Sequence, residues 1–144
     1  MPDAQVNIAY PTCELCNLLA FTADPNEMAT IIRYNEPFSL QVTVKFGGAG
    51  AIALMPLALR LKVDFSAKPV GAGDEIEIGT VTETTAAGLF AYNPTLKIAK
   101  GPRSIGLAPE KVYRVTALLQ GGAAEGPALI VGIIDTLTLQ IYKS

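Results

Sequence analysis

The sequence predicts an all-β protein in which two antiparallel sheets pack face to face as a sandwich. Residues 38–46 alternate strictly between apolar and polar side chains, and residues 57–65 repeat the pattern, as strands with one buried and one solvated face do. Clusters of Pro, Gly, Asn and Asp separate such segments and favour turns. No segment longer than one turn places apolar residues at helical spacing, so we expect essentially no helix.

The expected strands follow one another at short intervals along the whole chain. They are residues 6–9, 18–22, 30–34, 38–46, 57–65, 75–78, 80–85, 89–92, 95–99, 113–119 and 128–142. Pro11 interrupts regular structure after the first of them, so we expect a loop there that carries Cys13 and Cys16. Residues 23–26 form a turn, because Pro25 presets φ and the neighbouring Asp and Asn side chains bond nearby backbone.

The middle of the chain carries the clearest strands. Between the two alternating segments, residues 47–56 are rich in small side chains and carry no charge, which is unusual for a surface loop, so we expect them to pack against something. Gly79 breaks the alternation of the next strand, as a bulge does. Asn93 and Pro94 separate two short strands.

Residues 128–142 form the longest predicted strand. Leu137, Leu139 and Ile141 share one phase, and continuing that phase backwards would bury Asp135. A bulge at residues 132–135 shifts the register by one residue and removes the conflict.

Composition excludes several classes of function. Half of the 144 residues are apolar and 17% are charged, and the formal net charge is -2. The scattered charges argue against nucleic acid and a polybasic membrane anchor as partners, and no apolar run is long enough to span a membrane. The absence of histidine excludes Ser-His-Asp and Cys-His catalysis. We expect no enzyme activity and no cofactor.

The length fits one domain, comprising residues 1–144. We expect residues 1–35 to form an N-terminal arm with the first strands, and residues 36–144 to form the main sandwich. Residues 1–9 show neither a basic start nor a hydrophobic core of a signal peptide, which favours a cytoplasmic location and leaves the compartment open.

Leu107, Pro109 and Tyr113 stand at positions i, i+2 and i+6 before an alternating strand. This pattern resembles the tyrosine corner of fibronectin type III and other immunoglobulin-like sandwiches. The resemblance implies a Greek-key sandwich with an N-terminal extension, since the chain exceeds the usual length of about 100 residues. It also implies that the Tyr113 hydroxyl bonds to backbone within residues 106–109.

Cys13 and Cys16 form the only sequence motif whose side chains are suited to redox chemistry or metal binding. A redox CxxC usually lies at a helix N-terminus, which the sequence does not predict here, and a zinc site needs ligands beyond these two. The favoured interpretation is that the two cysteines form a local disulfide or remain inert thiols. The alternatives are an intersubunit metal site at Cys13 and Cys16, and a redox pair.

Apolar residues on both phases mark the first half of the last strand as a candidate interface. Leu129, Ile130, Val131 and Ile134 are the proposed contacts, and Asp135 is the sole charge of the strand. The sequence therefore favours a non-enzymatic interaction or structural module that forms a homo-oligomer or binds another protein. The alternatives are a carrier or binding protein for a small apolar or carbohydrate ligand, and a redox or metal protein that uses the two cysteines.

Overall fold

The computed structural model describes residues 11–23, 26–123, 126 and 128–143. Nearly all of its regular structure is strand, as predicted, and three short helical segments join the strands. The elements are β1 (Thr12–Thr22), β2 (Ile31–Arg33), β3 (Phe38–Gly47), α1 (Ala51–Leu54), η1 (Met55–Leu57), β4 (Arg60–Pro69), β5 (Ile76–Thr84), β6 (Ala91–Tyr92), β7 (Thr95–Ile98), η2 (Pro102–Ile105), β8 (Lys111–Gly122) and β9 (Ala128–Tyr142).

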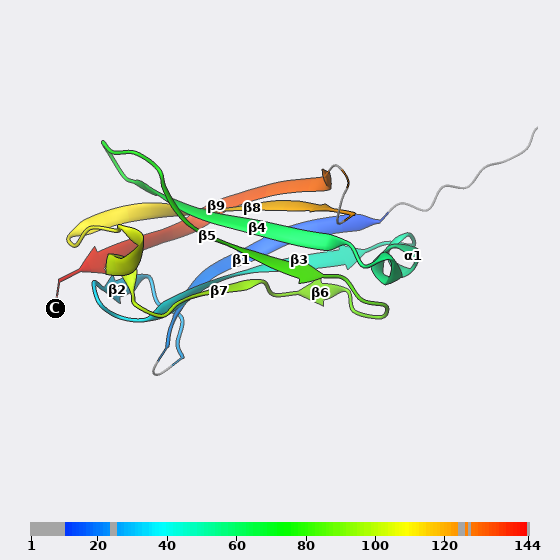
Figure 1. Cartoon of the computed structure of the whole chain (residues 1–144), viewed down its shortest axis with the longest axis horizontal. Helices are drawn as coiled ribbons and strands as arrows, with labels where there is room; N and C mark the ends of the chain where they lie inside the picture. Colours follow the sequence, from blue (N-terminus) through cyan, green and yellow to red (C-terminus); the bar gives the residue numbers. More distant parts are fainter. Residues whose placement is uncertain (1–10, 24–25, 124–125, 127, 144) are drawn as a thin grey trace, which may run out of the picture.

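Two sheets stack into an elongated sandwich (Figure 1). One sheet has the strand order β2-β9-β8-β4-β5, and the other joins β1, β3 and β6, with β7 also paired to β3. This arrangement confirms the predicted all-β sandwich. One pair departs from the prediction of purely antiparallel sheets, because β2 runs parallel to β9 at Gln140–Tyr142. β2 lies on the connection from β1 to β3 and belongs to the sheet opposite to these two strands.

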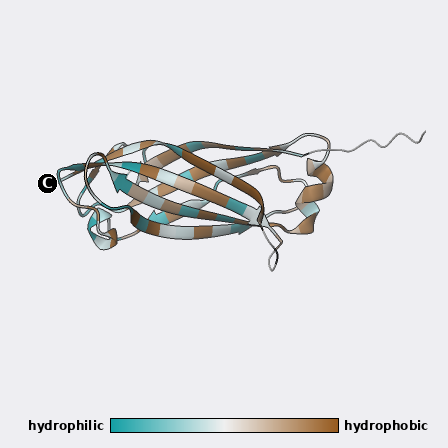
Figure 2. Ribbon diagram, turned by 90° about the horizontal axis from the view of Figure 1, so that it is seen from above, coloured by the Kyte–Doolittle hydropathy of each residue, from teal (hydrophilic) through white to brown (hydrophobic). Residues whose placement is uncertain are grey.

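The core consists of the inward-facing side chains of both sheets. Hydrophobic and hydrophilic residues alternate along the strands (Figure 2), so each sheet turns one face to the interior. The largest fully buried side chains are Tyr113, Phe65, Ile32, Leu40, Met55, Leu61, Leu107, Leu119, Leu139, Ile141, Val42 and Val44. They come from both sheets, from η1 and from the turn before β8, and they form one continuous cluster.

The tyrosine corner is present as predicted. The Tyr113 side chain is 1% exposed, and its hydroxyl oxygen accepts a hydrogen bond of 2.8 Å from the backbone N–H of Ala108. Leu107 is buried beside it. The bond ties the start of β8 to the turn that precedes it.

The predicted loop around the two cysteines is wrong. β1 is one continuous strand that pairs with β3 from Thr12 to Thr22, so this part of the predicted N-terminal arm is a full member of the sheet. A register shift between Cys16 and Leu19, with Asn17 at a φ of 54°, interrupts the apolar alternation that would have marked the strand. The strand predicted at residues 6–9 lies outside the described residues.

Residues 47–56 contain helix, which was not predicted. α1 and η1 carry Ala51 and Met55 into the core, which confirms that this uncharged segment packs against the sandwich. Such short helices span too few residues to show helical periodicity. The following strand begins at Arg60 rather than at residue 57, and Leu57 is exposed. None of the helices in the described part of the chain has the length and apolarity needed to cross a membrane.

Candidate functional site

The outer face of β9 carries a row of exposed aliphatic side chains. Leu129, Val131 and Ile133 are 71%, 66% and 70% exposed, and we call these three residues the β9 stripe. Leu118 of β8 lies opposite Ile133 in the antiparallel ladder and widens the apolar surface. Large exposed aliphatic side chains are common singly, but a contiguous row on one strand is typical of a contact surface.

A bulge in β9 decides which side chains belong to this row. Ala117 pairs with Ile134, whereas Val115 pairs with Leu137, so β9 has one extra residue between these two pairs. Ile134 and Leu137 consequently share the inner face, and the bulge lies at the C-terminal end of the predicted range. Ile130 lies on the same inner face, and both it and Ile134 pack against the core.

The structure therefore separates the four residues predicted to form the interface. Leu129 and Val131 point outward, while Ile130 and Ile134 point inward and pack against the core, so these two do not belong to the exposed row. The physical reason is the period of two between Ile130 and Ile134, which keeps both on the inner face up to the bulge. Ile133 was missed, although strict alternation counted back from the bulge identifies it.

The same part of β9 is also a strand edge without hydrogen-bonded pairing, although β1 of the other sheet approaches it near Gly132. β8 pairs with one side of β9 along its length, and on the other side β2 pairs only with Gln140–Tyr142. Within the described residues, the N–H and C=O groups that point away from β8 between residues 128 and 139 therefore have no strand partner. Such an edge can accept a strand from another chain.

A hollow lies next to the stripe on the outer face of the same sheet. Its volume is about 490 Å³, and Leu118 and Ile133 form its apolar side. The polar side includes Lys62 and Asp64, whose charged atoms are 3.9 Å apart.

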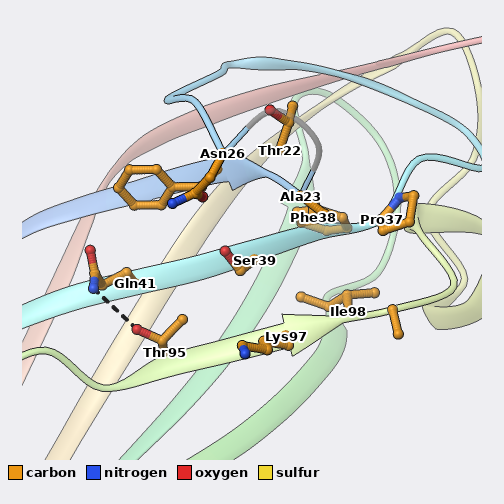
Figure 3. A pocket seen from close by; sticks show the side chains of 12 residues that line it. Thr22, Ala23, Asn26, Pro37, Phe38, Ser39, Gln41, Thr95, Lys97 and Ile98 are labelled. Atoms are coloured by element: carbon orange, nitrogen blue, oxygen red, sulfur yellow. Dashed lines mark hydrogen bonds between the residues drawn. The ribbon is translucent and has the colours of Figure 1, made fainter.

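A second candidate site is a groove on the outer face of the opposite sheet (Figure 3). The register places Phe21, Ser39 and Lys97 in one row across β1, β3 and β7, and it pairs Gln41 with Thr95 in the next row. The groove has a volume of about 560 Å³. Its other described lining residues are Thr22, Ala23, Asn26, Pro37, Phe38, Ile98 and Ala99.

Hydrogen bonds orient the polar side chains of this groove. Nε2 of Gln41 donates to Oγ1 of Thr95 at 3.1 Å, and that hydroxyl donates to the backbone oxygen of Asn93 at 2.9 Å. Thr43 donates to the side-chain oxygen of Asn93 at 2.8 Å. This site was not predicted from the sequence, because β3 and β7, which form it together with β1, are far apart in the chain.

The two cysteines lie on opposite faces of β1. Cys13 pairs with buried Phe46 and so lies on the inner face, where it is exposed near the start of β1, whereas Cys16 pairs with Thr43 on the outer face. Both thiols are free, so a local disulfide is not formed. Burial raises the pKa of the Cys13 thiol, which lowers its thiolate fraction near neutral pH. Among the described residues, no group of three or more Cys, Asp or Glu is arranged to hold a metal ion.

Comparisons with known proteins assign no family. No family model matches the chain, and no curated protein matches its sequence. Its structure is similar to that of a β-glucosidase from Listeria innocua in complex with glucose, with 11% identity, a TM-score of 0.46, and coverage of 94% of this chain but 17% of the glucosidase. It is also similar to AggA, the major subunit of aggregative adherence fimbriae type I from Escherichia coli, with 8% identity, a TM-score of 0.39, and coverage of 99% and 100%. Similarity at this level assigns no activity to the chain.

Proposed function

We propose that this chain is a non-enzymatic β-sandwich module that associates with a second copy of itself through residues 128–139 of β9. The observation that carries the proposal is the coincidence of the exposed β9 stripe with the open edge of the same strand. Each feature alone is common, but together they offer apolar area and backbone hydrogen bonds to one partner.

Burial of the β9 stripe gives the hydrophobic contribution to the free energy of association. Burying a Val, Leu or Ile side chain that is exposed contributes roughly 1.5 to 3 kcal/mol. Leu129, Val131 and Ile133 are each more than half exposed, so covering them together contributes several kcal/mol before the entropy of association is counted.

The unpaired edge of β9 gives the backbone hydrogen-bonding contribution to the free energy of association. Residues 128–139 extend over roughly 40 Å, and Asp135 is the only charged residue among them. Sheet edges that avoid pairing usually carry Lys, Pro or an inward-pointing charge, and this part of β9 has no Lys or Pro. Register shifts interrupt the β8–β9 ladder beside Asp135 and at Leu129, and the regular stretch between them covers residues 130–134.

A second copy suits this surface better than a chemically different partner. A two-fold axis near Val131 sets the two β9 strands antiparallel, and each Leu129 then lies across from the other copy's Ile133. The same apolar row continues across both sheets without a buried charge. The net charge of -2 produces little repulsion between copies.

Sedimentation equilibrium at micromolar concentration tests the proposal. The wild type should dimerise, and Leu129→Lys or Val131→Lys should raise the dissociation constant roughly 10- to 100-fold while leaving the circular dichroism spectrum unchanged. Leu89→Lys is the matched control, because Leu89 is 49% exposed and follows β5, at the sheet edge opposite to β9. A wild type that stays monomeric, or a control that dissociates equally, would refute the proposal.

Amide hydrogen exchange separates edge pairing from packing of the stripe alone. Edge pairing predicts slower exchange at alternate residues of β9 between 128 and 134 when the protein concentration rises, because only alternate N–H groups face the edge. Ile130→Lys is not a usable probe, since the Ile130 side chain packs against the core beside Gly121.

We also propose that the chain is one domain of the immunoglobulin-like class. The single core cluster and the tyrosine corner support this assignment, and the parallel β2–β9 pair is a departure from an all-antiparallel sandwich. One domain predicts a single cooperative unfolding transition, with equal calorimetric and van't Hoff enthalpies. Two resolved transitions would contradict it.

A further inference from the structure

We propose that the groove formed by β1, β3 and β7 binds an acidic saccharide, that is, a sugar ring carrying a carboxylate. This site lies on the sheet opposite to the β9 stripe, so the proposal is independent of self-association. The volume of about 560 Å³ lies within the usual range of roughly 300 to 1,000 Å³ for small-ligand sites.

The groove combines an apolar side with a polar floor. Phe21 is half-buried at one end of its row, and Pro37 adds apolar surface elsewhere in the groove. A pyranose ring has one face on which C–H groups predominate, and an aromatic side chain buries such a face well. The hydroxyl groups of the sugar lie around the rim of its ring, where Ser39 and Gln41 can reach them from the adjacent strand.

The Gln41 side chain is held in an orientation suited to hydrogen bonding with two hydroxyl groups of a sugar. Its carboxamide orientation is set by the bond from Nε2 to the Thr95 hydroxyl, which is in turn held by the Asn93 backbone oxygen. Oε1 and the second N–H of Gln41 have no partner within the described residues, so they present one acceptor and one donor. Side chains that are ordered before binding lose less entropy when the ligand arrives.

Lys97 determines the charge of the ligand. It is the one charged side chain among the described lining residues, and it forms no ion pair in the described part of the chain. An ammonium group beside hydroxyl and amide groups favours an anion that also carries hydroxyls. A carboxylate accepts a charge-assisted hydrogen bond from it, which is roughly twice as strong as a neutral one.

Titration of isotope-labelled protein followed by NMR tests the proposal. The probes are glucuronate, galacturonate and sialic acid oligomers, their neutral counterparts, and a tetraglutamate peptide. At least one acidic saccharide should shift the resonances of Phe21, Ser39, Gln41 and Lys97 with saturation in the millimolar range or below. Its neutral counterpart should bind roughly tenfold more weakly.

Three variants assign the interaction to the groove. Lys97→Gln should lower affinity for the acidic saccharide roughly tenfold and leave the neutral counterpart unaffected. Phe21→Leu and Gln41→Leu should each weaken both, because they remove the ring and the amide while retaining side-chain volume. Lys45→Gln is the matched control, since Lys45 is exposed on the outer face of β3 beyond the groove and should have no effect.

Several outcomes would overturn the proposal. One is the absence of shifts at these residues with every saccharide at about 10 mM, which would mean a dissociation constant above that concentration. The second is equal binding of neutral and acidic saccharides, and the third is equal binding of tetraglutamate at the same residues. The fourth is equal weakening of binding by Lys45→Gln and Lys97→Gln. None of these measurements requires the dimer, so failure here is distinguishable from failure of self-association.

Discussion

The Tyr113 hydroxyl provides a sharp test of how the sandwich is held together. Tyr113→Phe removes one oxygen and leaves the ring in place, so the only loss in the folded state is the 2.8 Å bond to the Ala108 N–H. The ring is buried, and the turn at Ala108 is partly covered, so water replaces the lost acceptor poorly. Leaving a buried donor without an acceptor costs roughly 1 to 3 kcal/mol.

We expect a cost near the lower half of that range, about 1 to 2 kcal/mol, because Ala108 is only half-buried. For a chain of this length, the melting temperature should fall by roughly 2 to 4 °C for each kcal/mol. Urea denaturation at neutral pH gives the free energy of unfolding, and an unchanged m-value would show that the fold is retained.

Tyr34→Phe is the matched control for this measurement. Tyr34 is also partly buried against the core, but its hydroxyl forms no hydrogen bond within the described residues. Its substitution should leave the unfolding free energy within about 0.5 kcal/mol of the wild type. If Tyr113→Phe were as stable as the control, the corner would contribute no stability and the reasoning would be refuted.

Three further predictions concern the backbone, the pH dependence and the cysteines. Gly101→Ala should destabilise the fold by roughly 2 kcal/mol more than Gly88→Ala in urea melts, because both have positive φ but only at Gly101 would a Cβ lie 2.7 Å from backbone; equal losses would count against it. Burial raises the pKa of Glu83 above its ordinary value of 4.5, so the folded state retains a proton that the unfolded chain releases, and stability falls as pH rises through that window. Glu83→Gln should flatten this slope between pH 4 and 7, and an unchanged slope would exclude Glu83 as its source. Double replacement of Cys13 and Cys16 by Ser should leave the circular dichroism spectrum intact, since both thiols are free, and unfolding of the variant would show that they are needed.

The local sequence pattern was sufficient to predict a strand and its ends wherever apolar and polar residues alternate strictly. β3 and the span of β9 were predicted almost to the residue, because one buried face imposes alternation on each. The bulge of β9 was also predictable, since Asp135 and the neighbouring aliphatic residues cannot share one phase. Only residues 18–22 of β1 were predicted as strand, because the irregularity at Asn17 breaks the alternation and the first half of β1 has no other local signal for a strand.

Tertiary structure alone decided which surfaces are available. The sequence established that residues 128–134 are too apolar for one buried face, and the strand order determined that β9 has an open edge, because β2 covers only its C-terminal end. The groove is even less predictable from the sequence, because it exists only when strand pairing places Phe21, Ser39 and Lys97 in one row. Such a row depends on pairing between strands far apart in the chain, and the side-chain period within one strand contains no information about its partner.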